Sequence, residues 1–147
     1  HSKYNDKWRG AGDVTLIDYY RGGESLGHRW QGFKVNDMDI VIDMKEQKEI
    51  ESVAVGCLQN VGNWVFFPNY IEVATSTDGK DFNPVGRLET IKEWQRLISK
   101  KDDLTVAFPK TKCRYVKVFA KNIGYNPVWH NFSGSEAWLF VDEIVIN

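Results

Sequence analysis

The segment YIEVATSTDGKDF, residues 70–82, carries the clearest fold signal in the chain. Its first half alternates apolar and polar side chains, which is the pattern of a strand with one buried face. Asp78-Gly79 follows, and this residue pair favours a two-residue hairpin turn. We therefore predict a β-hairpin here.

The same alternation recurs outward along the chain. Five further segments show it, each rich in Val, Ile, Phe or Tyr and bounded by turn residues: 39–44, 50–58, 104–109, 114–121 and 139–147. Short strands at this spacing predict an all-β sandwich or barrel. Because no linker, repeat or low-complexity segment interrupts them, we expect one domain over residues 1–147.

Two stretches depart from this pattern. Residues 1–35 are Gly-rich with few alternating apolar side chains, so they read as one long ordered loop, and loops of that length in compact domains are functional or held by something. Residues 86–103 are open to two interpretations, a helical turn or two or a pair of strands. The apolar spacing that suits a helix belongs to Ile91, Trp94, Leu97 and Ile98.

Composition narrows the class of protein. Aromatic residues make up 14% of the 147 residues, which is more than a core of this size needs, so we expect some aromatic rings at the surface. The formal net charge of −1 argues against binding to nucleic acid or to anionic lipid. No apolar stretch approaches the roughly 20 residues that span a bilayer. The chain reads as a domain of a larger protein.

The two cysteines, Cys57 and Cys113, each lie next to a strand-like run. Two interpretations stay open: two small buried thiols, which free cysteine favours, or a disulfide.

Two common enzyme signatures are absent from the sequence, which contains no His-Glu-x-x-His and no phosphate-binding Gly-x-x-x-x-Gly-Lys. Its Gly-x-Ser-x-Gly match, GESLG (23–27), lies in the Gly-rich loop and not at the turn between a strand and a helix that a nucleophile elbow requires. The carboxylate pair Asp102-Asp103 lies in the charge run SKKDD, which we interpret as a solvated turn. The chain is therefore not expected to be an enzyme.

A second acidic pair is more informative. Asp18 lies in the Gly-rich N-terminal loop, and Glu143 lies in the final strand-like run, where it alternates with Asp142 and Ile144. A carboxylate against a loop rich in free carbonyl groups suits a hard cation, because Ca²⁺ takes six to eight oxygen ligands. The alternative is a glutamate at a solvated sheet edge.

Loop aromatics next to planar polar side chains favour a sugar site, because sugars stack an apolar face on flat rings and pair their hydroxyl groups with amides, imidazole or guanidinium. Three segments combine these residue types: 27–33, 58–68 and 125–138. The alternative is that each tryptophan, Trp30 above all, caps one end of the core.

Taken in order, several motifs resemble a known family. They are TLIDYYRGG (15–23), RWQGF (29–33), the segment 53–82, CRYVKVFAKN (113–122) and AWLFVDEIVI (137–146). Over nearly the whole chain the sequence resembles the F5/8 type C, or discoidin-like, domain. It is most similar to the family 32 carbohydrate-binding modules appended to bacterial β-hexosaminidases and β-galactosidases.

The resemblance implies an eight-stranded jelly-roll β-sandwich and a structural metal, usually calcium. Asp18 and Glu143 would supply carboxylates. Mainly backbone carbonyl groups would come from Thr15, Tyr20, Gly23 and Asp142. The sequence departs from the family at Tyr19, where glycine is usual, and at Gly23, where serine or threonine is frequent.

The resemblance also implies a ligand site on loops at one end of the sandwich. The matching positions are His28, Arg29, Gln59, Asn63, Trp64 and Trp138, while Trp129 and His130 belong to the narrower branch and either touch a sugar or brace the loop that does. Trp138 is the best platform candidate. The family arginine is replaced near Gln59, and that planar fork contributes to galactose binding in the family.

The expected function is a non-catalytic carbohydrate-binding module. It would hold an attached glycoside hydrolase near glycans with terminal galactose or N-acetylhexosamine, outside the cytoplasm. The alternative is a structural module that packs on the catalytic domain of the same chain without binding sugar, and the missing arginine favours it.

Overall fold

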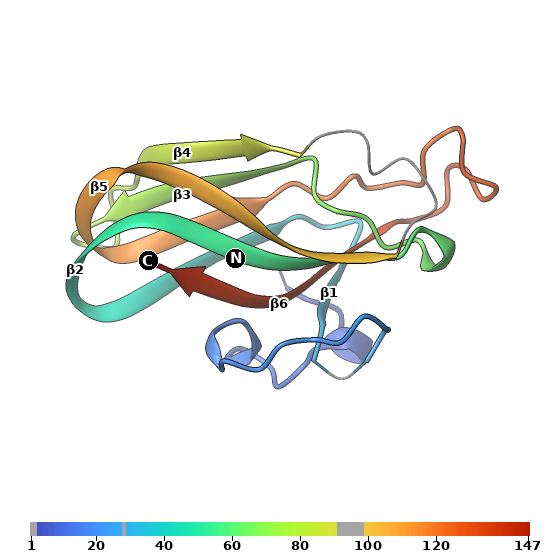
Figure 1. Cartoon of the computed structure of the whole chain (residues 1–147), viewed down its shortest axis with the longest axis horizontal. Helices are drawn as coiled ribbons and strands as arrows, with labels where there is room; N and C mark the ends of the chain where they lie inside the picture. Colours follow the sequence, from blue (N-terminus) through green and yellow to red (C-terminus); the bar gives the residue numbers. More distant parts are fainter. Residues whose placement is uncertain (1–2, 28, 91–98) are drawn as a thin grey trace.

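The computed structural model describes residues 3–27, 29–90 and 99–147. In these ranges six strands form one antiparallel sheet in the order β1-β6-β2-β5-β3-β4 (Figure 1). The strands are β1 (Gln31–Lys34), β2 (Met38–Gln59), β3 (Tyr70–Ser76), β4 (Asn83–Glu89), β5 (Lys100–Ala120) and β6 (Trp138–Ile146). Three short 3-10 helices are η1 (Asp6–Trp8), η2 (Thr15–Ile17) and η3 (Val61–Asn63).

Two of the strands are long enough to run through both layers of a sandwich. Residues 38–43 of β2 pair with 115–120 of β5, which also pair with β3, and β3 pairs with β4. Beyond the register shifts in β2, residues 52–59 pair with 100–107 of β5 and with β6, and β6 pairs with β1. Each layer thus holds four strand segments, and the eight segments confirm the predicted all-β sandwich.

The core lies between the two layers. Ile71 and Val73 of β3 and Val116 and Val118 of β5 are fully buried, as the alternation of their strands predicts. Cys57 and Cys113 belong to the same apolar cluster and are free, so the prediction of two buried thiols is confirmed. Burial raises the pKa of both thiols.

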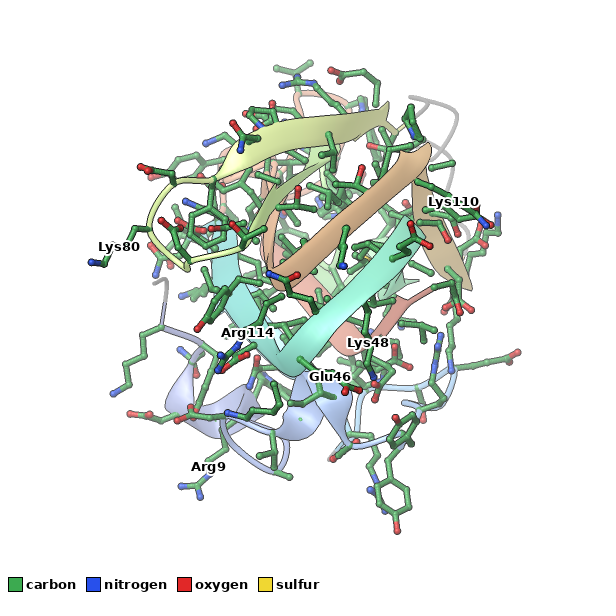
Figure 2. All side chains as sticks on the ribbon, turned by 90° about the vertical axis from the view of Figure 1, so that its left-hand side faces the viewer. Arg9, Glu46, Lys48, Lys80, Lys110 and Arg114 are labelled. Carbon is green, nitrogen blue, oxygen red and sulfur yellow. The ribbon has the colours of Figure 1, made fainter. Side chains whose placement is uncertain are left out.

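The predicted hairpin joins β3 to β4, but its loop is longer than predicted. Thr75 pairs with Asn83, so the prediction of a two-residue turn is wrong. The Asp78 carboxylate accepts the N–H groups of Lys80 and Asp81 and closes a wider loop, in which Gly79 has a φ of 75°. This end of the sandwich faces the viewer in Figure 2 and carries exposed charged side chains, among them Glu46, Lys48, Lys80 and Lys110.

Four residues of the charge run SKKDD, 100–103, belong to strand β5, so its interpretation as a solvated turn is wrong. Lys101 pairs with Leu58 and Asp103 pairs with Gly56, both across the ladder between β5 and β2. In the ambiguous segment 86–103, the ends therefore belong to β4 and β5. The residues on which a helical turn depended (91, 94, 97 and 98) lie outside the described residues.

The N-terminal loop lies below β6 and β1 in Figure 1, against the outer face of their layer. Trp30 packs beneath this loop and is fully buried in a cluster with Leu58, Val65 and Phe140. The prediction that this tryptophan belongs to a core is therefore confirmed. No helix in the described part of the chain is long and apolar enough to cross a membrane.

Candidate functional site

A β-bulge in β6 lies at the centre of the predicted metal site. Val55 pairs with Ile144 and Cys57 pairs with Val141, so Asp142 and Glu143 together oppose the single residue Gly56. A bulge re-aims side chains, and here both acidic residues bind the N-terminal loop although they are neighbours in a strand. Both are buried, which contradicts the alternative of a glutamate at a solvated sheet edge.

The Asp142 carboxylate is neutralised by the protein's own cations. Its Oδ2 accepts hydrogen bonds from Nε of Arg21 at 3.1 Å and from the backbone N–H of Gly22 at 2.8 Å. Nζ of Lys101 lies 3.3 Å from the same oxygen and donates to the Gly22 carbonyl at 2.6 Å. Because the side chain is fully buried, these bonds offset a large cost of desolvation.

Arg21 extends this cluster across the sheet. Its guanidinium also binds Asp103 of β5, so it bridges β6 and β5 above Gly56 of β2. A Cβ atom at position 56 would overlap Oδ1 of Asp142 and lie 2.7 Å from Nη2 of Arg21. The glycine therefore makes room for the bridge. These hydrogen bonds and charges raise the pKa of Arg21, although desolvation, the largest effect, acts in the opposite direction.

Glu143 has no comparable compensation. Its carboxylate is 3% exposed and accepts one backbone N–H, from Tyr19 at 2.9 Å, while Tyr19 holds a left-handed φ of 64°. Desolvation raises the pKa of Glu143, and the negative charge of Asp18 raises it further. Among the described residues neither Asp18 nor Glu143 forms an ion pair. Since buried charges are paired or bind metals, these two carboxylates fit a cation.

The other predicted ligands contribute less to such a site. Thr15 is buried, and its hydroxyl accepts Ala11 N–H at 2.6 Å and donates to the carbonyl of Arg9. Oδ2 of Asp142 is occupied as described, whereas its Oδ1 is buried without a hydrogen-bond partner among the described residues. Tyr20 and Gly23 have no side-chain oxygen suited to Ca²⁺ and could supply only backbone carbonyl groups. The described residues contain no group of three His, Cys, Asp or Glu side chains that could hold a metal.

The predicted ligand loops meet at the other end of the sandwich. The 3-10 helix η3 and the loop between β5 and β6 lie side by side at the right of Figure 1. The ring centroids of Trp64 and Phe132 are 5.6 Å apart, and Nε2 of His130 lies 3.0 Å from the Val61 carbonyl. Trp64 ends η3 with a left-handed φ of 64°, a conformation that costs a non-glycine residue free energy and that clusters at functional sites.

A pocket of about 270 Å³ opens between these two loops. Its lining consists of Gly62, Trp129, His130, Asn131 and Phe132. Phe132 is 58% exposed and Trp129 is 38% exposed, so both rings are half presented to solvent. This surface, which we call the aromatic end, has uncharged polar groups beside flat rings.

The structure brings together four of the predicted glycan residues, namely Asn63, Trp64, Trp129 and His130. Asn63 is exposed and donates to Oδ1 of Asn60 at 3.0 Å. Gln59 is buried. His130 is buried as well, and its two ring nitrogens hydrogen-bond with the Val61 carbonyl and the Phe132 N–H, contacts that brace the loop.

The other predicted glycan residues have different neighbours. Trp138 is half-buried, with its ring packed edge-on against Phe140 at 5.8 Å and Lys34 above it. Arg29 stacks on the ring of Tyr20 in the N-terminal loop, with its guanidinium carbon 4.0 Å from the ring centre. His28 lies outside the described residues. Trp138 and Arg29 are not among the residues that line the pocket of the aromatic end.

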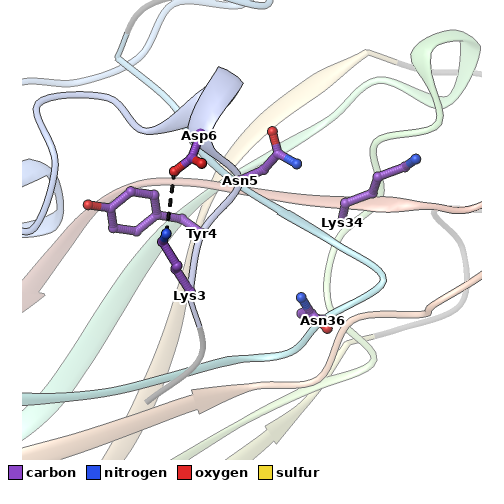
Figure 3. Close-up of a pocket in the computed structure, with 6 residues that line it drawn as sticks. All are labelled: Lys3, Tyr4, Asn5, Asp6, Lys34 and Asn36. Carbon is purple, nitrogen blue, oxygen red and sulfur yellow. Dashed lines mark ion pairs between the residues drawn. The ribbon is translucent and has the colours of Figure 1, made fainter.

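Figure 3 shows a second hollow, of about 260 Å³, between the N-terminus and β1. Its charged side chains are already paired. Lys3 lies 3.7 Å from Asp6, and Lys34 binds Glu136 outside the hollow. It presents no flat ring backed by unpaired polar groups, because the hydroxyl of its one aromatic residue, Tyr4, donates to Asp13.

Sequence reasoning missed three residues of these sites. Phe132 is the most exposed ring of the pocket, but phenylalanine lacks the polar atom that drew attention to its neighbours. Arg21 and Lys101 were missed because their partners are far away in the sequence. One signal was available for them: Gly56 interrupts a strand, and an isolated glycine in a strand indicates a close approach of another group.

These features define the chain as a two-layer antiparallel β-sandwich module that presents its candidate sites on loops. Its sequence matches the F5/8 type C domain over residues 2–139, and the chain belongs to that family. Comparison with curated proteins found no sequence match.

Several solved structures of the same fold are described as carbohydrate-binding modules. One is a pectin-binding module with a TM-score of 0.60 and 16% identity, covering 99% of this chain and 86% of that chain. Another is a family 32 module from Clostridium perfringens in complex with GalNAc-β-1,3-galactose, with a TM-score of 0.54, 18% identity and coverage of 90% and 80%. The C-terminal domain of a chitobiase from Bacteroides fragilis has a TM-score of 0.54, 16% identity and coverage of 94% and 84%.

Proposed function

We propose that the chain is a non-catalytic carbohydrate-binding module that binds glycans at the aromatic end. The observation that carries this proposal is the pocket between η3 and the loop before β6, where Trp129 and Phe132 present half-exposed rings beside Asn131. A flat ring receives the apolar face of a sugar, and a neighbouring amide pairs with its hydroxyl groups. Membership of the F5/8 type C family supports the same function.

The lining of this pocket favours a neutral sugar. None of its five residues carries a carboxylate, an ammonium or a guanidinium group. Both ring nitrogens of His130 already bind backbone groups, so the imidazole offers no free donor to a ligand. A uronic acid would bring a negative charge without a counter-charge, at a cost of desolvation. Terminal N-acetylhexosamine or galactose is the class we propose.

The same lining argues against catalysis. Glycoside hydrolysis generally uses two carboxyl groups on either side of the scissile bond. The pocket offers neither. We therefore place the chemistry in an attached glycoside hydrolase, the catalytic domain of the same chain, which the module would hold at its substrate by raising the effective concentration.

Calorimetric titration with N-acetylgalactosamine, N-acetylglucosamine, galactose and galacturonic acid tests this function. We expect binding of one or more of the neutral sugars and a response at least about ten-fold weaker for the acid. Phe132→Ala and Trp129→Ala should each reduce affinity at least about ten-fold, since loss of a stacking ring removes roughly 1.4 kcal/mol.

The matched control is Tyr19→Ala, which removes a 92% exposed ring on the opposite loop. It should leave affinity unchanged. Binding that survives both pocket variants and is lost in Tyr19→Ala would place the ligand at the N-terminal loop instead.

A second candidate function is docking onto the catalytic domain. It is favoured by the exposed Val128 and Tyr125, which extend the apolar surface beyond the pocket. Large exposed apolar patches mark interaction sites. If this function holds, Val128→Ser weakens association of the module with its catalytic domain and no sugar produces heat of binding.

We further propose that calcium binds between Asp18 and Glu143, with backbone carbonyl groups of the N-terminal loop completing the shell. The support is the buried, unpaired carboxylate of Glu143 and its proximity to Asp18. Extracellular modules bind calcium with dissociation constants of about 0.1–1 mM, which suits a protein outside the cytoplasm. We propose that the module functions outside the cytoplasm.

A further inference from the structure

The loop that forms one wall of the aromatic end is organised around His130. The side chain is 8% exposed, at the centre of residues 126–132. Its Nδ1 accepts the backbone N–H of Phe132 at 3.0 Å, and Nδ2 of Asn126 lies 3.4 Å from the same atom. Its Nε2 lies 3.0 Å from the carbonyl oxygen of Val61 in η3.

These partners select one tautomer of the imidazole. A backbone N–H can only donate, so Nδ1 must carry a lone pair. A carbonyl oxygen can only accept, so the single proton of the ring lies on Nε2 and is donated to Val61. The Asn126 amide agrees with this assignment, because its Nδ2 also donates to the carbonyl of Phe132 at 3.1 Å.

Protonation of Nδ1 is incompatible with this arrangement. The added hydrogen would point at the N–H groups of Phe132 and Asn126, and two donors cannot share a bond. The groups that face His130 are the Val61 carbonyl from η3, the ring of Phe66, and Asn126, Trp129 and Phe132 from its own loop. Among these described neighbours none is titratable or charged, so no carboxylate stabilises an imidazolium ion.

We infer that His130 is a pH-sensitive latch that positions the rings of the glycan pocket, a role that rests on the function proposed above. The neutral imidazole holds the loop against η3, which fixes Trp129 and Phe132 on either side of it. Once the ring is protonated, its bond to Phe132 is lost and this wall is released. The affinity of the module for its glycan then falls in acid, although His130 does not contact the sugar.

Two measurements on the whole chain test the latch. The first needs no ligand: the backbone amide resonance of Phe132 is followed by NMR between about pH 7.5 and about pH 5, the range in which histidine titrates. We expect it to move together with the imidazole resonances of His130. The amide of Lys80, in the hairpin loop at the other end of the sandwich, should follow a different course.

The second measurement compares affinity for N-acetylgalactosamine, or whichever neutral sugar binds, at the same two pH values. The loss of one loop-fixing hydrogen bond predicts a decrease of about ten-fold in acid. His130→Asn keeps an acceptor for the Phe132 N–H and cannot be protonated, so its affinity should be nearly equal at both values.

The outcomes separate the latch from the glycan site. If the Phe132 amide titrates with His130 but no sugar binds at any pH, the latch stands and the proposed function is wrong. If the amide is unaffected by protonation of His130, or if the pH dependence of affinity persists in His130→Asn, the latch is wrong. Should that variant fail to fold, the NMR titration of the parent chain decides alone.

Discussion

The N-terminal loop is fastened to strand β6 and the loop before β6 is fastened to η3, by opposite kinds of interaction. Residues 18–22 are tied to Asp142 and Glu143 by the Arg21 guanidinium and two backbone N–H groups, and the ammonium group of Lys101 binds both Asp142 and the Gly22 carbonyl. Residues 126–132 are tied to η3 by an imidazole, an amide and stacked rings, without one formal charge. One attachment should therefore respond to charge and ions, the other to protonation of a single histidine.

This difference shows how the fold can hold a loop in place and still leave the aromatic end open to a ligand. Charge pairs fix the loop that covers the outer face of the sheet, where the proposed ligand is an ion. Neutral bonds fix the loop that exposes rings, so no charge competes with an uncharged ligand. The following changes test this division, starting with the largest expected effect.

Gly56→Ala should be the most damaging change at the charged attachment. The new Cβ overlaps the Asp142 carboxylate and crowds Arg21, so the buried ion pair must break. Breaking such a pair costs about 3 kcal/mol, which urea unfolding would detect as a lower midpoint. Gly23→Ala is the control, because a Cβ there lies 4.0 Å from its nearest neighbour, the backbone nitrogen of Ser25. Equal stability of the two variants contradicts the prediction.

Asp142→Asn should destabilise the chain by about 3 kcal/mol, because it removes the counter-charge of Arg21 and Lys101 but keeps the shape of the side chain. Glu136→Gln, which loses an exposed partner of Lys34, should change the free energy of unfolding little. Thermal unfolding of both variants measures the difference. A larger effect at Glu136 than at Asp142 would show that burial does not govern these pairs.

Glu143→Gln should separate the effect of calcium binding on stability from the effect of Glu143 ionisation. The pKa of Glu143 is raised above its ordinary value of 4.5, so without metal its ionisation costs stability as the pH rises from about 4.5 through the raised pKa. The glutamine variant lacks this cost and should be as stable as the parent, or more so, at neutral pH in chelator. Calcium at about 100 times its dissociation constant should stabilise only the parent, by about 2.7 kcal/mol.

Scanning calorimetry with chelator and with calcium measures both effects. Stabilisation of the glutamine variant by calcium would place the ion elsewhere. The opposite result would be an unsubstituted chain that is more stable in chelator at pH 7 than at pH 5, while the stability of Glu143→Gln does not change with pH. That result would contradict the destabilising effect of Glu143 ionisation.

The smallest effect should come from the cysteines. Cys57 and Cys113 are free and buried in the core, so a reducing agent should leave the unfolding temperature unchanged. Burial raises the pKa of both thiols, and thiol reagents should not modify them until the chain unfolds. Rapid modification in the native protein contradicts this prediction.

Much of the fold was predictable from local patterns. The alternation of Ile71 and Val73, or of Leu139 and Val141, places one face of each strand in the core, and the structure buries those residues. The expected number of segments was also right, although β2 and β5 each supply two of them through bends that no local signal marked. Lys45, with a φ of 70°, lies at such a bend although it is not a glycine.

The sites were predictable only in part, because they depend on distant partners. The pairing of Asp18 with Glu143 was accessible through the chemistry of hard cations. The bulge that also turns Asp142 toward the loop was not, since it is a difference of one residue between two paired strands. At the aromatic end, composition located the loops but could not tell that Trp138 packs on Phe140 while Phe132 is exposed.

The central claim is that the aromatic end, and not the charged loop, binds glycan. Its most direct test is an NMR titration of the calcium-loaded chain with N-acetylgalactosamine, N-acetylglucosamine and galactose, which maps the amides that shift. We predict that a binding sugar shifts Gly62 and residues 129–132 and leaves residues 18–23 unchanged. Shifts confined to residues 18–23, or none with any of the three sugars, would contradict the claim.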